Sequence, residues 1–435
     1  MKILLKGMDA VTADREKGFV KNADIGIENG IIKFIAPDRG GPEDFGADRI
    51  IDGRRRLVMP GLVNAHTHCS MTLLRNAADD LPLDRWLFDR IFPIEARMTE
   101  EDIYWGTMLG ITEMLKTGTT AFADMYLHMN ATARAVCDSG IRANLSRSPR
   151  DYVEGEKHKN VDAFPECREY HRTWHGKNNG RIRVFVEIHS TYLFDLDSLE
   201  KSAGLASELG TGIQIHILET LKEKEDSLKE YGRSPVQICE ETGVFDVPVV
   251  AAHCVHLSDR DMDIMLSRGV YAAHNPTSNL KLGSGIARVP EMLEKGIRVA
   301  LGTDGAASNN NLNMFEEMHL AALLHKGTHM NPELVNAAEV VRMATVNGAE
   351  AIGFGDLTGR IRPGMRADLT IIDTDRAHLT PLNDPHSALV YAAQGSDVDT
   401  VLVDGEILLD EGRLTTIDEE RVKYEARRIA ARLCK

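Results

Sequence analysis

The stretch from Leu57 to His68 reads LVMPGLVNAHTH, an apolar run that ends in two histidines one residue apart. Seven more apolar runs follow, separated by stretches with helical spacing: TAFADMY (120–126), IRANLSR (141–147), RIRVFVEIHS (181–190), GIQIHILET (212–220), VPVVAAHCVH (247–256), GVYAAHNP (269–276) and RVALGTDG (298–305). Strands that alternate with amphipathic helices are typical of a parallel sheet. Eight such units predict an α/β fold of the closed (β/α)8, TIM-like kind.

The two ends of the chain have a different pattern. Residues 1–57 contain short β-rich runs with a hairpin signal at Asn29-Gly30, and similar runs return after residue 358 with turns at Asp404-Gly405 and Glu411-Gly412. Each half is short for a stable sheet, so we expect a small antiparallel unit in which both ends form one composite β-sandwich. The predicted domains are therefore 1–57 with 358–435, including a C-terminal helix, and a catalytic barrel over 58–357.

Composition excludes several classes of protein. The 435 residues include 51 Lys and Arg against 66 Asp and Glu, and no basic stripe is present that could neutralise the phosphates of a nucleic acid. No apolar run reaches the ~18 residues of a membrane span, and the charges at Lys6 and Asp9 interrupt any secretion signal. The six cysteines lack CxxC spacing, which favours a reducing cytoplasm. We expect no nucleic-acid or membrane partner, and the sequence leaves a homo-oligomer open.

Polar residues end the apolar strands again and again. The carboxyl ends of barrel strands meet at one mouth, where the active sites of such barrels lie, and here they carry His66, His68, Arg147, His189, His216, His253, His274 and Asp304. His66 and His68 alternate onto the same face of their strand and can reach one ion. With His216 and Asp304 they offer three nitrogen ligands and one oxygen ligand, a set that suits zinc or another divalent first-row ion.

Five segments carry a resemblance to known proteins: PGLVNAHTH (60–68), IHILETLKE (215–223), AAHCVHL (251–257), HNPTSNLKLGSGIA (274–287) and LGTDGAASNN (301–310). In this order they resemble the amidohydrolase superfamily and, within it, the 5-methylthioadenosine/S-adenosylhomocysteine deaminases. The resemblance covers nearly the whole chain. It implies that His66, His68, His216 and Asp304 hold one divalent metal ion per chain, with zinc as the expected metal, and that the substrate is a small nucleoside.

The resemblance also assigns catalytic roles. Glu219 is the acid that protonates the purine ring, His253 lies beside the attacking water, and Asp304 moves a proton from that water to the leaving ammonia. Glu219 follows His216 by three residues, so strict strand alternation would point the two side chains to opposite faces. We therefore expect the chain to leave regular β geometry by Thr220.

Substrate contacts follow from the same resemblance. Glu95 matches a residue that binds the ribose hydroxyls, His189 one that contacts the nucleoside, and Arg147 one at the 5′ side of the substrate, while Glu219 and Asp304 contact the purine. Family members often carry a second Arg after the third strand, where this chain offers Lys157, His158 and Lys159. The 5′-methylthio and 5′-deoxy nucleosides therefore stay open as substrates beside S-adenosylhomocysteine.

Other functions remain to be weighed against adenosine-type deamination. Relatives of the hydantoinase kind hold two metal ions bridged by a carboxylated Lys on the fourth strand, and the run RIRVFVEIHS contains no Lys. Action on another aminated heterocycle, of the guanine or triazine type, is the main alternative, and a scaffold without catalysis is a third. Among the other histidines, His256 is expected in a loop, His274 behind the site, and His171, His175, His319, His325 and His329 on the surface.

Overall fold

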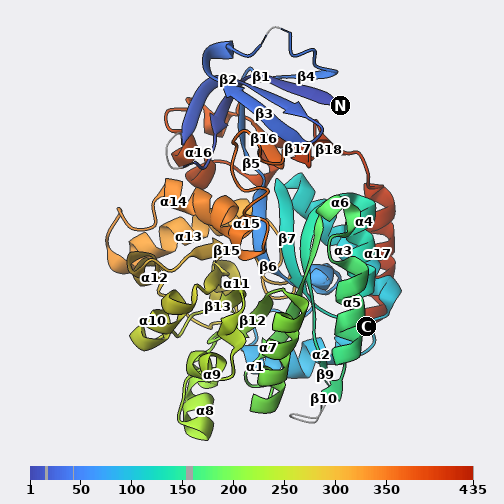
Figure 1. The fold of residues 1–435 in the computed structure, drawn as a ribbon, viewed down its shortest axis with the longest axis vertical. Helices are drawn as coiled ribbons and strands as arrows, with labels where there is room; N and C mark the ends of the chain where they lie inside the picture. Colours follow the sequence, from blue (N-terminus) through green and yellow to red (C-terminus); the bar gives the residue numbers. More distant parts are fainter. Residues whose placement is uncertain (15–17, 43, 153–159, 435) are drawn as a thin grey trace.

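The computed structural model describes residues 1–14, 18–42, 44–152 and 160–434. Eight strands, all parallel, form the barrel in the order β15-β14-β13-β12-β11-β8-β7-β6 (Figure 1). Their bounds are β6 (Leu62–Thr67), β7 (Thr119–Met125), β8 (Arg142–Arg147), β11 (Ile182–Ser190), β12 (Ile213–Ile217), β13 (Val249–His253), β14 (Tyr271–His274) and β15 (Val299–Leu301). The predicted barrel fold is confirmed, with one barrel strand in each of the eight apolar runs.

The first and last barrel strands come together without forming a regular ladder. The Asp304 N–H donates to the His66 carbonyl over 3.0 Å, and the Asn64 side-chain amide donates to Thr303 Oγ1 over 2.6 Å. The barrel is therefore nearly closed, and this seam brings Asp304 next to the His66–His68 pair.

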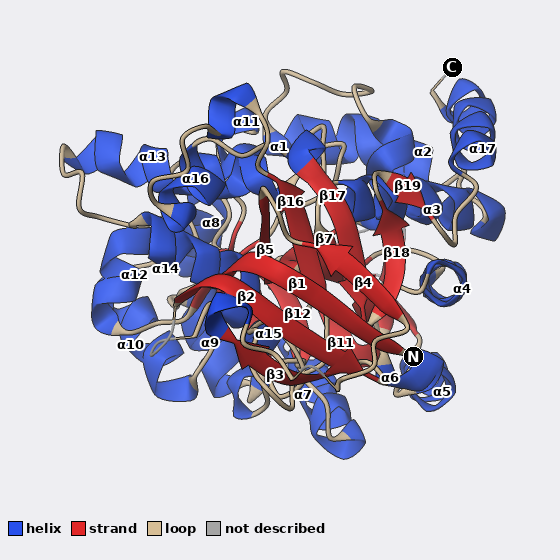
Figure 2. Cartoon of the chain, turned by 90° about the horizontal axis from the view of Figure 1, so that it is seen from above, coloured by secondary structure: helices blue, strands red, loops and turns tan. Residues whose placement is uncertain are grey.

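Strands from both chain ends combine in one nine-stranded sheet, in the order β19-β18-β17-β16-β5-β1-β2-β3 with β4 paired to β1 (Figure 2). Hairpins form at Asn29-Gly30 and Asp404-Gly405, as the turn signals predict. The sheet is mixed rather than antiparallel, because β1 runs parallel to both β4 and β5. The strands are β1 (Lys2–Val11), β2 (Phe19–Glu28), β3 (Ile31–Ala36), β4 (Arg49–Asp52), β5 (Arg56–Pro60), β16 (Leu369–Asp373), β17 (Val398–Val403), β18 (Glu406–Asp410) and β19 (Arg413–Leu414).

The chain crosses from this mixed sheet to the barrel at Gly61. The apolar run that reads as one strand in the sequence is split, with β5 pairing to β16 up to Pro60 and β6 starting at Leu62. A Cβ at Gly61 would lie 2.0 Å from Thr120 Oγ1, so the Thr120 side chain occupies the space that any side chain at residue 61 would need. Residues 57–60 consequently belong to the mixed sheet.

The mixed sheet covers the amino-terminal ends of the barrel strands. Arg142, the first residue of β8, forms a buried two-pronged ion pair with Asp368, with Nε to Oδ2 at 2.6 Å and a second bond of 3.0 Å. Arg181, directly before β11, pairs with Asp404 and Glu406. Since these contacts join the strand starts to the sheet, the carboxyl ends are left at the other end of the barrel.

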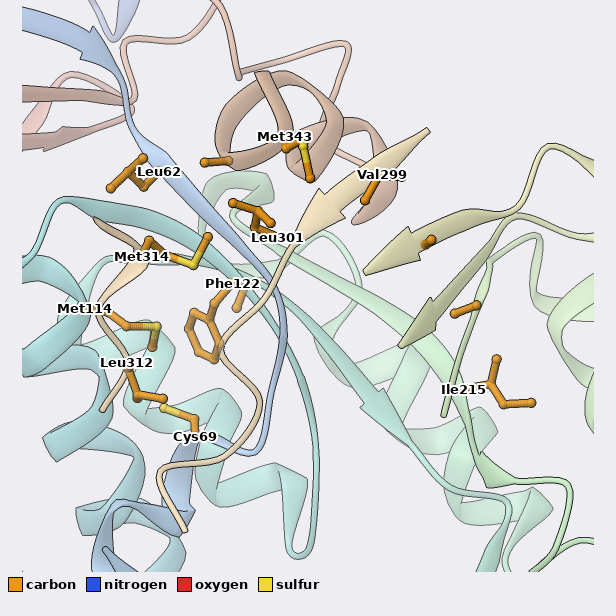
Figure 3. Packing of buried hydrophobic residues seen from close by; sticks show 14 of the residues in the cluster. Leu62, Cys69, Met114, Phe122, Ile215, Val299, Leu301, Leu312, Met314 and Met343 are labelled. Carbon is orange, nitrogen blue, oxygen red and sulfur yellow. The ribbon is translucent and has the colours of Figure 1, made fainter. Parts of the chain in front are cut away.

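Helices surround the barrel and bury its outer face. Figure 3 shows Leu62, Leu301, Met114, Met314 and Met343 gathered in the layer between the strands and the helices. The longer barrel helices are α3 (Glu100–Lys116), α4 (Met129–Ser139), α5 (Phe164–Trp174), α7 (Leu196–Leu209), α8 (Leu221–Tyr231), α10 (Asp259–Arg268) and α13 (Met314–His329). Shorter ones are α9 (Pro235–Glu241), α11 (Pro276–Lys281), α12 (Val289–Lys295) and α14 (Ala337–Arg342). In the described part of the chain, we find no helix with the length and apolarity that crossing a membrane requires.

The C-terminal helix α17 (Glu419–Leu433) leaves the mixed sheet and packs on α3, as Figure 1 shows. Its buried face places Ile429 and Leu433 against the 3-10 segment Cys69–Leu74 that follows β6. This helix, expected together with the sheet of the chain ends, is therefore held by barrel elements.

Candidate active site

A cavity of about 640 Å³ opens at the carboxyl ends of the barrel strands. Its wall contains nearly all of the side chains that the sequence predicts for the site: His68, Glu95, Arg147, His189, His216, Glu219, His253 and Asp304. The remaining one, His66, lies directly behind His68, with ring centroids 5.0 Å apart. The strand ends therefore converge as a barrel requires.

Four of these side chains form a compact group that can hold a metal ion. One ligand atom from each of His66, His68, His216 and Asp304 lies within 4.8 Å of all the others. Asp304 Oδ1 is 3.4 Å from His66 Nε2 and 3.3 Å from His68 Nε2. The group combines residues from β6, β12 and the end of β15, so it exists only after the barrel closes.

Hydrogen bonds fix the ring orientation of two of these histidines. His68 Nδ1 donates to the carbonyl of Met125 over 2.6 Å, and His216 Nδ1 donates to the carbonyl of His189 over 2.7 Å. In a neutral ring Nε2 then carries a lone pair, and the two Nε2 atoms lie 3.1 Å apart. A metal ion would be bound by both lone pairs, and backbone acceptors at Nδ1 are the usual support of metal-bound histidines. The residues present therefore fit a divalent metal ion.

The pKa shifts within this group also fit a metal-ion site. Burial lowers the pKa of His66 to about 4, which keeps its ring neutral and able to act as a ligand. Burial would also lower the pKa of His68, but Asp304 and the Met125 carbonyl raise it to about 9. Burial would raise the pKa of Asp304, and the two histidines bring it well below its usual range. The site thus favours a carboxylate together with one positive charge.

Asp304 is held in one orientation. Its backbone has a left-handed φ of 60°, and its Oδ2 accepts hydrogen bonds from Ser278 Oγ at 2.7 Å and Ser308 Oγ at 2.8 Å. These contacts leave Oδ1 to face the histidines. One carboxylate is therefore placed both to bind a metal ion and to exchange a proton at the centre of the cavity.

Glu219 reaches the cavity because the chain leaves β geometry directly after β12. Leu218 takes a left-handed φ of 51°, and Glu219 then lines the cavity instead of pointing away from it. Glu219 Oε2 lies 3.8 Å from His253 Nε2, and Oε1 accepts a bond from Ser284 Oγ at 3.4 Å. Burial raises the pKa of Glu219, which favours the protonated acid.

His253 is fixed from behind by an amide. Its Nδ1 donates to Asn279 Oδ1 over 2.9 Å, so Nε2 faces the cavity next to Glu219. The residue itself has a left-handed φ of 72°, which turns its ring at the end of β13. His253 is thus positioned to hydrogen-bond a small polar species in front of the histidine cluster.

Three further predicted residues line the cavity without belonging to the four-residue group. Glu95 ends α2 (Phe92–Glu95) as a buried carboxylate that accepts a 2.5 Å hydrogen bond from the Tyr126 hydroxyl, and burial raises its pKa. His189 lies beside His216, and burial lowers its pKa to about 3, so its ring is neutral. Arg147 is half-buried at the end of β8. These residues therefore extend the polar lining of the cavity beyond the four residues of that group.

The cavity contains residues that the sequence did not single out. An apolar wall is built by Leu83, Trp86, Leu87 and Phe92 from the helical segment 83–95, and Arg150 lies beyond Arg147 on the same chain segment. Arg150 could have been found from the sequence, because it is a basic residue only three positions after Arg147. Lys157, His158 and Lys159, which the chain offers where family members often carry a second Arg, lie outside the described residues.

Two histidines lie behind the site rather than in it. His274 is buried at the end of β14 and absent from the cavity wall, as expected for a residue behind the site. His325, expected on the surface, is instead fully buried on α13 with its ring 5.4 Å from His274. The prediction for His325 was wrong because a helical residue's exposure depends on which face packs against the barrel. His256 lies in a loop, where its Nε2 donates to the Ser284 carbonyl.

Comparisons with known proteins agree with this geometry. The family model described as "Amidohydrolase family" matches residues 57–408. A 5-methylthioadenosine/S-adenosylhomocysteine deaminase of Acetivibrio thermocellus is 59% identical over 433 residues, which are 100% of both chains. An adenosine deaminase from Xanthomonas campestris with bound zinc has a TM-score of 0.94 at 32% identity and covers 99% of this chain and 98% of its own.

An atrazine chlorohydrolase of Arthrobacter aurescens TC1 complexed with zinc has a TM-score of 0.91 at 26% identity, covering 98% of this chain and all of its own. Proteins named as a deaminase and as a chlorohydrolase share this fold, so the fold alone does not distinguish the two activities. The 59% identical relative is named as a deaminase. The chain belongs to the amidohydrolase family and, within it, to the family of the 5-methylthioadenosine/S-adenosylhomocysteine deaminases.

Proposed function

We propose that this protein is a metal-dependent hydrolytic deaminase of 5′-substituted adenosines. The products are the corresponding inosine and ammonia. The observation that carries the proposal is the placement of a buried carboxylic acid, Glu219, at the edge of a three-histidine, one-aspartate cluster inside a nucleoside-sized cavity. The 59% identical relative of the same length carries the name of this activity.

We propose His66, His68, His216 and Asp304 as the ligands of one divalent ion, with zinc as the metal. The donor set suits zinc, and two structural neighbours have zinc bound. When bound, such an ion supplies a Lewis acid that makes water a nucleophile at neutral pH.

The chain's own residues then account for every proton. Glu219 donates its proton to purine N1, which makes C6 open to attack by water, and His253 Nε2 orients that water. One water proton passes to Asp304 and on to the C6 amino group, which leaves as ammonia when the C6–N bond breaks. The second water proton returns to Glu219 as the C6 carbonyl forms. The acid and the aspartate are thus both restored.

Substrate binding is assigned to three cavity residues outside the proposed ligand set. Glu95, held by Tyr126, accepts hydrogen bonds from the ribose hydroxyls, and neutral His189 contacts the nucleoside. Arg147 lies at the 5′ side. The apolar wall around Trp86 offers a surface for the nucleoside rings and for an uncharged 5′ group.

The location of the protein is also a proposal. All six cysteines are free, which fits a reducing compartment, and we propose the cytoplasm.

The test is ammonia release from a panel of nucleosides and bases. The zinc-loaded protein should deaminate adenosines with different 5′ groups and leave guanine, cytosine and chlorinated triazines untouched. Elemental analysis should give about one ion per chain, and Glu219→Gln should keep that ion while slowing turnover by about 10² or more. No release from any adenosine would overturn the proposal.

A further inference from the structure

The turn that delivers Glu219 to the cavity is conformationally unfavourable for its sequence. Leu218, a bulky residue with a Cβ, takes the left-handed conformation that glycine adopts far more easily. A strained backbone conformation persists only where the surroundings determine it more strongly than the local preference does. The contacts around Leu218 and Glu219 should therefore include a group whose task is to hold this turn.

The Glu223 side chain, on the first turn of α8, makes those contacts. Its Oε1 accepts the Leu218 N–H at 3.0 Å, and its Oε2 accepts the Glu219 N–H at 2.9 Å. The carboxylate is buried but does not line the cavity, so it cannot touch the substrate. From the other side, the Leu218 carbonyl accepts the N–H groups of Val255 and His256, both at 3.0 Å.

Glu223 thus binds two successive backbone donors with its two oxygens. Burying a carboxylate costs free energy, and burial raises the pKa of Glu223 to about 7. A neighbouring side chain, Glu225, is exposed on the same helix and makes no comparable contact to this turn. We therefore relate the burial of Glu223 to its contacts with the turn at Leu218 and Glu219, and not to its place in α8.

We infer that Glu223 is a positioning residue for the catalytic acid: by accepting the amides of Leu218 and Glu219 it holds the turn that aims the Glu219 carboxyl at the purine. The inference rests on the proposed role of Glu219 as the acid. It concerns rate rather than metal binding, because the contacts of Glu223 lie beyond His216 in the chain and the His216 ring is fixed separately by the His189 carbonyl.

The experiment is a double-mutant cycle on the metal-loaded full chain with 5′-methylthioadenosine as the substrate. Glu223→Gln keeps one acceptor oxygen and faces the other amide with an NH2 group. We expect kcat to fall about ten- to a hundredfold, since small misplacements of a catalytic group have effects of this size, with KM changed by less than about twofold. In the Glu219→Gln background the same change should cost less than about threefold, because there is no acid left to position.

Glu225→Gln is the matched control for loss of charge on α8 and should keep the wild-type rate. Glu223→Ala should be slower than Glu223→Gln; if it fails to fold, the cycle with Gln still decides the matter. Equal losses in both backgrounds, or loss of the metal ion in Glu223→Gln, would overturn the inference. If the unsubstituted enzyme deaminates no adenosine, or if Glu219→Gln has full activity, the proposed function fails instead.

Discussion

Three residues at or shortly after the ends of barrel strands share one backbone conformation. Leu218, His253 and Asp304 each take a left-handed φ, with values of 51°, 72° and 60°. In a regular strand, side chains alternate between the inside and the outside of the barrel. The left-handed residue ends that alternation and lets a chemically important side chain turn over the mouth. Buried hydrogen bonds to side chains of the short helix α11 and of the first turn of α8 hold these residues.

At the residue scale, Arg147 should act on specificity rather than on chemistry. It ends β8 and lines the cavity outside the four-residue ligand group, and the proposed function assigns it to the 5′ side of the substrate. A charged hydrogen bond to a carboxylate contributes about 1.5 to 3 kcal/mol, whereas an uncharged methylthio group gains little from it. Arg147→Ala should therefore lower kcat/KM for S-adenosylhomocysteine about ten- to a hundredfold and for 5′-methylthioadenosine only a few-fold. Equal losses measured on both substrates would withdraw the assignment.

A second residue-scale prediction concerns His325 and pH. Burial lowers its pKa from 6.5 to about 4, and the groups around it are His274 on β14, Glu291 on α12, and Lys326 and His329 on its own helix. The stabilising contribution of the neutral ring is complete above pH 6.5 and is lost as pH falls toward 4, because the unfolded chain takes up the proton first.

By pH 5 that loss amounts to ~2 kcal/mol. His325→Gln removes the titrating ring, so its urea midpoint should fall less between pH 7 and pH 5 than that of the unsubstituted protein. An identical fall in both proteins would assign the pH dependence to other groups.

At the element scale, the passage of the chain from β5 to β6 depends on a single glycine. Gly61 lets the chain leave the mixed sheet and enter the barrel within one residue, against the buried side chain of Thr120. The same apolar run therefore serves two sheets. Without this close approach β6 would be displaced along its axis, and with it His66 and His68.

Gly61→Ala should consequently destabilise the protein, since overpacking of a filled core costs about 1 to 3 kcal/mol. The matched control is Gly204→Ala on the exposed side of α7, where a new Cβ meets nothing within 4 Å. That change should stabilise the protein by about 0.5 to 1 kcal/mol, as expected for a helix interior. Thermal melting of both variants gives the comparison, and a Gly61→Ala protein as stable as the unsubstituted one would disprove the packing argument.

At the scale of the whole molecule, the barrel and the mixed sheet are joined by a buried ion pair. Arg142 and Asp368 are at most 1% exposed, and the Asp404 N–H also donates to the same carboxylate at 2.7 Å. This junction is at the opposite end of the barrel from the cavity. It connects a strand start to the last third of the chain, so it couples the folding of the chain ends to that of the barrel.

Asp368→Ala removes the two-pronged partner of the buried Arg142 guanidinium and leaves only the 3.4 Å contact to Asp404, so it should cost about 3 kcal/mol. Lys201→Ala, which breaks an exposed pair with Asp197, should cost at most about 1 kcal/mol and serves as the control. Urea unfolding at constant metal concentration measures both. A loss below about 1 kcal/mol for Asp368→Ala would show that Asp404 alone is a sufficient partner for Arg142 and would contradict the prediction.

The sequence alone was sufficient for what is local or periodic. Eight apolar runs ending in polar residues predicted the barrel and the convergence of His66, His68, His216 and Asp304, because parallel strands in a barrel place their carboxyl ends at one mouth. The hairpins at Asn29-Gly30 and Asp404-Gly405 followed from turn chemistry within a few residues.

Only the tertiary structure decided what depends on neighbours far along the chain. The left-handed turn at Leu218 is set by Glu223 and by the amides of Val255 and His256, and no period in the sequence reports such contacts. The split of one apolar run at Gly61 depends on Thr120, and the burial of His325 depends on the face of α13 that packs on the barrel. Hydrophobic patterning specifies which elements form, but the direction of a side chain at a strand end is fixed by packing and hydrogen bonds between elements that meet only in the folded protein.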